Sequence, residues 1–102
     1  ALLYQNGEFA EACTLQQEVY SARKLFLGGE HPHTLSAMFC LATTYSTMSN
    51  YKDAAPMFKQ VYEQRSLVLG SEHPDTILAA ASYIAATNKW IEELENKLND
   101  IK

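Results

Sequence analysis

The chain has 102 residues, 47% of them hydrophobic, and its formal net charge at pH 7 is −4. This length supports one small domain with a modest core. No cluster of Lys and Arg is present, which argues against a nucleic-acid partner. No apolar run reaches the roughly 18 residues of a membrane span, so membrane insertion is not expected. Because the chain opens with Ala1-Leu2-Leu3-Tyr4 rather than methionine, we expect it to be a fragment of a longer protein.

The elements predicted along the chain are all helices. Apolar residues recur every three or four positions, the spacing of a helix that buries one face. Residues 1–5 have the pattern of a truncated helix, which the turn signal Asn6-Gly7 ends. Further helices are predicted over residues 8–27, 32–47 and 51–69, and an alanine-rich helix from Pro74.

One eight-residue turn occurs twice. Leu-Gly-Gly-Glu-His-Pro-His-Thr at 27–34 returns as Leu-Gly-Ser-Glu-His-Pro-Asp-Thr at 69–76, an offset of 42 residues. Glycine can supply the left-handed residue that closes a helix, and proline favours the first position of the next one. Each copy therefore predicts a helix end followed at once by a helix start.

The long helices before these turns also match at the 42-residue offset. The identical pairs are apolar, small, aromatic or basic, and we expect them at packing positions between stacked units. They are Ala12/Ala54, Val19/Val61, Tyr20/Tyr62, Arg23/Arg65 and Leu25/Leu67.

Two local features interrupt the helical pattern of the second unit. Ser49-Asn50 offers a break and an N-cap for the helix that follows, with Asp53 in its first turn. Pro56 lies in the second turn of that helix, where it removes one backbone hydrogen bond and predicts a bend.

The C-terminal stretch predicts an amphipathic helix. Thr87-Asn88-Lys89 can form a tight break, or the preceding helix can run straight through it. The apolar seam beyond has helical spacing and consists of Trp90, Ile91, Leu94, Leu98 and Ile101. We expect this seam to cap the array. The alternative is homodimerisation through one long helix, because Ile77, Ile84, Ile91 and Leu98 recur at intervals of seven.

The repeated turn, Leu41-Ala42-x-x-Tyr45 and Tyr51-x-x-Ala54-x-x-x-Phe58 together resemble the tetratricopeptide repeat in its 42-residue, kinesin light chain-like form. The resemblance implies an all-α fold, a right-handed α-solenoid of antiparallel helix pairs with about two to two and a half repeats and a C-terminal capping helix. It implies one domain over 1–102, divided into a partial repeat (1–28), a full repeat (29–70), a partial repeat (71–87) and an amphipathic helix (88–102).

The resemblance also implies a scaffold that binds a peptide or protein segment, such as a cargo adaptor, on a concave face. Phe39 and Cys40 stand where some relatives carry an asparagine pair that holds the peptide backbone, which favours apolar rather than polar recognition. The alternative for Phe39 and Leu78 is a role in the core. The candidate groove residues are Ser36, Phe39, Cys40, Thr43, Ser46, Thr47, Leu78, Ala81 and Ala85.

The sequence supports no enzyme, cofactor or metal site. His31 and His33 lack further ligands at metal-binding spacing, so the histidines of the repeated turn are expected to form turns and helix starts. Cys40 has no sequence signature of a catalytic nucleophile. Cys13 and Cys40 show no paired spacing, so we expect reduced thiols in a cytoplasmic protein.

Overall fold

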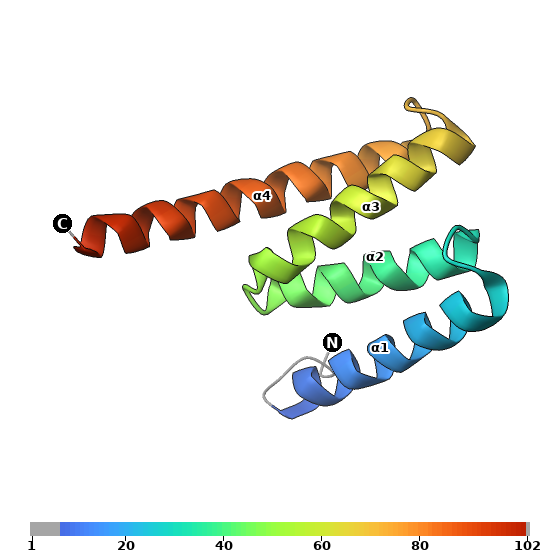
Figure 1. The fold of residues 1–102 in the computed structure, drawn as a ribbon, viewed down its shortest axis with the longest axis horizontal. Helices are drawn as coiled ribbons and strands as arrows, with labels where there is room; N and C mark the ends of the chain where they lie inside the picture. Colours follow the sequence, from blue (N-terminus) through green and yellow to red (C-terminus); the bar gives the residue numbers. More distant parts are fainter. Residues whose placement is uncertain (1–6, 102) are drawn as a thin grey trace.

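The computed structural model describes residues 7–101. These residues form four α-helices and no strand, in agreement with the all-α fold expected from the sequence (Figure 1). The expected helix over residues 1–5 lies outside the described part. The helices are α1 (Gly7–Leu27), α2 (Pro32–Thr47), α3 (Tyr51–Leu69) and α4 (Pro74–Ile101).

The helices stack in the order of the chain. Each helix packs mainly against the one before it and the one after it, and successive helices run in opposite directions (Figure 1). Short connections force this arrangement, because a three- or four-residue turn leaves the next helix no other place than beside its predecessor. α2 and α3 lie in the middle of the stack, with α1 beside α2 and α4 beside α3.

The two glycine turns have the same geometry. Gly28 and Gly70 adopt φ values of 92° and 91°, in the left-handed region that glycine enters without strain. The N–H of Gly28 donates to the carbonyl oxygen of Lys24, and that of Gly70 donates to the carbonyl oxygen of Ser66, each over 3.1 Å. Both glycines therefore end their helices as the sequence predicts.

The turn histidines start the next helices. His31 is the N-cap residue of α2, and its Nδ1 accepts a hydrogen bond from the N–H of His33 over 3.1 Å. Nδ1 of His73 accepts the equivalent bond from Asp75 at the start of α4, also over 3.1 Å. These bonds satisfy N–H groups that the first helical turn leaves without a partner. The expected role of these two histidines at helix starts is confirmed.

The turn between α2 and α3 differs from the expectation. Asn50 occupies the N-cap position, but its side chain makes no capping bond. Its Nδ2 instead donates to the carboxylate oxygen Oδ2 of Asp53 over 2.8 Å, a charge-assisted hydrogen bond. Beyond it, α3 continues through Pro56, which is exposed.

The core lies between α2, α3 and α4 and contains small residues at its closest contacts. Ala42 and Ala54 have no exposed surface, and they share one cluster with Phe58 and Ala86. Val61 packs in a second cluster with Met38 and Ala79. Alanine at these places lets the helix backbones approach closely, so that a longer side chain would push them apart.

Not every repeated residue lies in this core. Leu25 and Leu67 are 78% and 80% exposed, and Val19 is 45% exposed. The expectation that the identical pairs mark packing positions is therefore wrong for the leucine pair and for Val19. Leu25 and Leu67 lie in the last turns of α1 and α3, on a side of each helix that no described residue covers.

The C-terminal stretch continues α4 without a break. Of the two alternatives for residues 87–89, the structure has the uninterrupted helix. α4 has 28 residues against the 16 of α2, and its end projects beyond the other helices (Figure 1). The seam residues lie along this extension and are largely exposed: Ile91 47%, Leu94 47%, Leu98 54% and Ile101 83%, with Trp90 half-buried.

Candidate functional site

The candidate groove residues occupy α2 and α4, the two helices expected to line the concave face. Six belong to α2 and three to α4. All are exposed except Phe39 and Ser46, which are half-buried. The expected surface is therefore accessible, although Phe39 also packs against the core.

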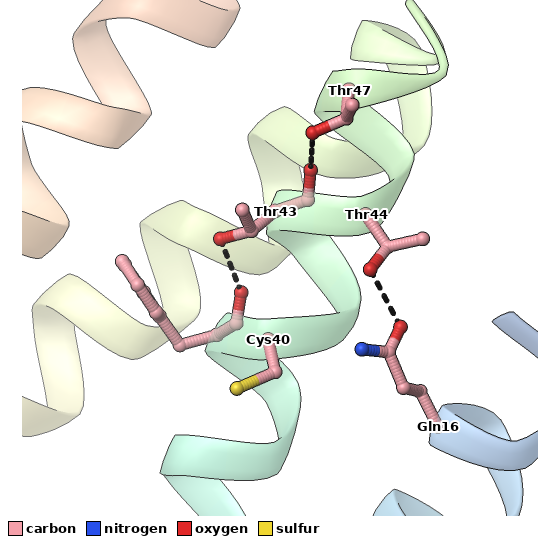
Figure 2. Close-up of a pocket in the computed structure, with 6 residues that line it drawn as sticks. Gln16, Cys40, Thr43, Thr44 and Thr47 are labelled. Atoms are coloured by element: carbon pink, nitrogen blue, oxygen red, sulfur yellow. Dashed lines mark hydrogen bonds between the residues drawn. The ribbon is translucent and has the colours of Figure 1, made fainter. Parts of the chain in front are cut away.

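A first pocket lies between α1 and α2. Its volume is about 340 Å³, near the lower end of the range for ligand sites. Figure 2 shows Thr44 of α2 pointing toward Gln16 of α1, with Cys40, Thr43 and Thr47 on neighbouring turns of α2. The lining residues are Gln16, Phe39, Cys40, Thr43, Thr44 and Thr47.

The threonine hydroxyls of this pocket already have partners. Thr43 and Thr47 each donate to the carbonyl oxygen four residues earlier, Phe39 and Thr43, over 2.9 Å (Figure 2). Thr44 donates to Oε1 of Gln16 over 2.6 Å. Because the hydroxyl protons are all engaged, the threonines have no proton left to donate to a ligand. Most of the exposed lining of the pocket is apolar.

A second pocket lies between α2 and α4, with a volume of about 240 Å³. It shares Thr43 and Thr47 with the first pocket, so the two form one continuous surface to which α1, α2, α3 and α4 all contribute. Neither lining contains a charged residue. The lining of the second pocket is Thr43, Ser46, Thr47, Phe58, Ser82 and Ala85.

The first pocket lies where α2 meets α1, and the second lies where α4 meets α2 and α3. The 42-residue offset of the repeat pairs residues of the first contact with residues of the second. Phe58 of α3 corresponds to Gln16 of α1, and Ala86 corresponds to Thr44. Phe58 and Ala86 are buried in one apolar cluster, whereas Gln16 and Thr44 form the hydrogen-bonded pair beside the first pocket. A polar pair therefore holds the place that an aromatic ring fills one unit later.

The comparison with protein families supports this repeat. The family model described as Tetratricopeptide repeat matches residues 1–66. The chain belongs to the tetratricopeptide repeat family. A comparison with curated proteins found no match. Tetratricopeptide repeats are a non-enzymatic scaffold family that generally mediates protein–protein interaction, which agrees with the broad function expected from the sequence.

Within this tetratricopeptide repeat surface, the candidates fall into distinct groups. The first pocket gathers Phe39, Cys40, Thr43 and Thr47, and the second gathers Thr43, Ser46, Thr47 and Ala85. Ser36 instead lies in a separate small pocket with Arg65 and Asp75. Leu78 and Ala81 line none of these three pockets, although Leu78 is 51% exposed and so is not a core residue.

Phe39 serves the core as well as the pocket. Its ring lies 5.4 Å from the ring of Phe58 in an edge-to-face arrangement and packs on both core clusters. The guanidinium carbon of Arg65 lies 5.0 Å from the Phe39 ring centroid, within the range of a cation–π contact. Phe39 therefore anchors α2 on α3, and only part of it is available to a ligand.

Sequence reasoning missed Gln16 and Thr44 of the first pocket and Phe58 and Ser82 of the second. The repeat offered a signal for Gln16. The signal was present, because continuing the motif Tyr51-x-x-Ala54-x-x-x-Phe58 into the first copy places Gln16 where phenylalanine is expected. On its own, however, a single glutamine on a long helix is typical of a solvated position.

Several other observations bear on chemistry and location. Within residues 7–101, no group of three His, Cys, Asp or Glu side chains is arranged to hold a metal ion. Cys13 is buried and Cys40 is exposed, and both are free thiols. None of the four described helices is both long and apolar enough to cross a membrane.

Proposed function

We propose that this chain binds an extended or helical protein segment on the surface formed by the two threonine-lined pockets. Recognition is by apolar contact rather than by charge. The bound segment belongs to a cargo or adaptor protein, as the resemblance to kinesin light chain-like repeats implies. The observation that carries this proposal is the engaged state of the hydroxyls of Thr43, Thr44 and Thr47 beside an uncharged pocket.

The methyl groups and other apolar atoms that line this surface determine which ligands it binds. Apolar side chains of a partner can bury methyl groups there at about 25 cal/mol per Å² of apolar area. Charged side chains gain no partner and lose hydration, so they are disfavoured. The two free thiols fit a reducing compartment, and we place the protein in the cytoplasm.

The test begins with a random peptide display library. Peptides selected by the wild-type chain are expected to be rich in apolar residues and poor in charged ones. A selected peptide titrated into isotopically labelled protein should shift the backbone amide signals of Thr43, Ser46, Thr47, Ser82 and Ala85. Shifts confined to the convex helices α1 and α3, or a selection dominated by charged peptides, would refute the proposal.

A second candidate is a structural or oligomerisation role for the C-terminal seam. The observation that favours it is the exposure of Ile91, Leu94, Leu98 and Ile101 on the projecting end of α4. The seam would then cap a longer array or pair two copies of the chain. Sedimentation of wild type against the Leu94→Glu, Leu98→Glu double variant separates the two: a dimer that becomes monomeric requires pairing, and a wild-type monomer excludes it.

A further inference from the structure

The side-chain amide of Gln16 is only partly used within the fold. Gln16 belongs to α1, is half-buried and lines the first pocket. Its Oε1 accepts the hydrogen bond from Thr44, and Figure 2 shows its nitrogen turned away from Thr44, on the side facing Cys40. Among the described residues, hydrogen bonds engage this amide only through its oxygen. Its two N–H groups are therefore available to a ligand in the pocket.

Two serines give the second pocket comparable groups. Ser46 of α2 and Ser82 of α4 both line it and are half-buried. The hydroxyls of Thr43 and Thr47 donate to carbonyl oxygens of their own helix, whereas neither serine hydroxyl has a hydrogen-bond partner within the described part of the chain. Each serine hydroxyl can donate one hydrogen bond. The surface thus offers neutral donors in both of its pockets.

Neutral donors of this kind match the carbonyl oxygens of a peptide backbone. An extended segment carries one such oxygen at every residue, about 3.3 Å apart along the chain, and none is engaged within the segment. A helix engages its carbonyl oxygens internally except those of its last turn, so it offers free ones at one end only. Donors in two pockets are therefore better matched by an extended segment than by a helix.

We propose that the bound segment is extended and that Nε2 of Gln16 donates a hydrogen bond to one of its backbone carbonyl oxygens. This inference rests on the binding function proposed above and specifies the conformation of the ligand. The bond from Thr44 to Oε1 holds the amide in the orientation that presents its N–H groups to the pocket. Apolar side chains of the segment contact the apolar lining of both pockets.

Two glutamate variants of α1 test the role of Gln16, by calorimetric titration of a peptide that the wild-type chain selects from the random library. Gln16→Glu keeps an oxygen that accepts from Thr44 but replaces the N–H groups with a second acceptor. It should weaken binding about tenfold, because an acceptor then faces the carbonyl oxygen. Gln17→Glu introduces the same charge one residue along. Gln17 is exposed and lines neither pocket, so this variant should bind like the wild type.

Nuclear magnetic resonance of the wild-type complex supplies a second readout. The side-chain N–H signals of Gln16 should move downfield when the peptide binds. Those of Gln17, which donates to the hydroxyl of Tyr45 over 2.6 Å, should stay in place. In a carbon-13-labelled peptide, the Cα signals of the bound state should lie upfield of their random-coil positions, as in an extended backbone.

The outcomes separate this inference from the function on which it rests. Equal affinities for Gln16→Glu and Gln17→Glu, or downfield Cα signals typical of a helix, would overturn the inference. The proposed function would still stand if Thr43→Arg weakened binding of the same peptide. If the chain selects no peptide at all, the proposed function fails and the inference fails with it.

Discussion

The Thr44 hydroxyl of α2 donates to the carboxamide oxygen of Gln16 of α1 over 2.6 Å. One repeat later, Phe58 and Ala86 hold the two equivalent positions and are buried together. The same helix junction is thus closed by an aromatic ring in one copy, whereas in the other a polar pair borders an open pocket. The two junctions thus differ at both positions, and the polar pair borders the larger of the two pockets of the candidate surface.

The double variant Gln16→Phe, Thr44→Ala gives the contact between α1 and α2 the two residue types that Phe58 and Ala86 supply one repeat later. The new ring is expected to bury part of its surface against α2 and raise the free energy of unfolding by about 1 kcal/mol. Urea denaturation measures this change. Glu18→Phe places the same ring on the exposed side of α1 and should give no gain; a loss of stability in the double variant would contradict the equivalence of the junctions.

The histidine caps give a second prediction. His31→Ala removes the acceptor for the N–H of His33 and should lower the free energy of unfolding by about 1 kcal/mol. His31→Asn keeps a side-chain acceptor at the N-cap and should retain most of the stability. His33→Ala is the matched control, because only its backbone takes part. If thermal unfolding shows that the His33→Ala variant is less stable than the His31→Ala variant, the cap contributes little to the free energy of unfolding.

The sequence was sufficient to predict the helices and their turns, because those depend on local chemistry. Gly28 and Gly70 need only their own backbone freedom to end a helix, and the histidine caps act within two residues. The 42-residue period then places equivalent helices in equivalent positions. Local signals repeated at a fixed period therefore give the architecture.

What the sequence did not predict depends on contacts between helices. Gln16 pairs with a residue 28 positions away, and that pairing is set by how α1 rotates against α2. Phe39 lies at the border of the packed face, where a small rotation decides between core and groove. For residues 87–89, the choice between break and helix was open because neither glycine nor proline occurs there.

Arg65 connects two elements, which gives a third prediction. Its guanidinium donates to the carbonyl oxygen of Asp75 over 3.0 Å and also stacks on Phe39. Arg65→Met should therefore lower the free energy of unfolding by about 1–2 kcal/mol. Lys59→Met removes an exposed cation from the same helix and should change it little. Equal effects of the two substitutions in urea denaturation would argue that only net charge matters.

Close helix contact at Ala42 gives a fourth prediction. Ala42→Leu adds three carbons where no surface is exposed, and should cost about 1–3 kcal/mol through displaced helices. Ala81→Leu makes the same change at an exposed position of α4 and should be nearly neutral. Denaturant titration compares them, and a neutral Ala42→Leu would mean that α2, α3 and α4 are not closely packed there.

The central claim, that the threonine-lined surface binds an apolar protein segment, is tested most directly by calorimetric titration of one selected peptide into two threonine variants. Thr43 lines both pockets, and Thr14 makes the same type of bond to the carbonyl four residues earlier but lines neither pocket. The account predicts that Thr43→Arg weakens binding about tenfold or more, roughly 1.4 kcal/mol, while Thr14→Arg leaves the affinity unchanged. Equal affinities for the two variants would contradict it.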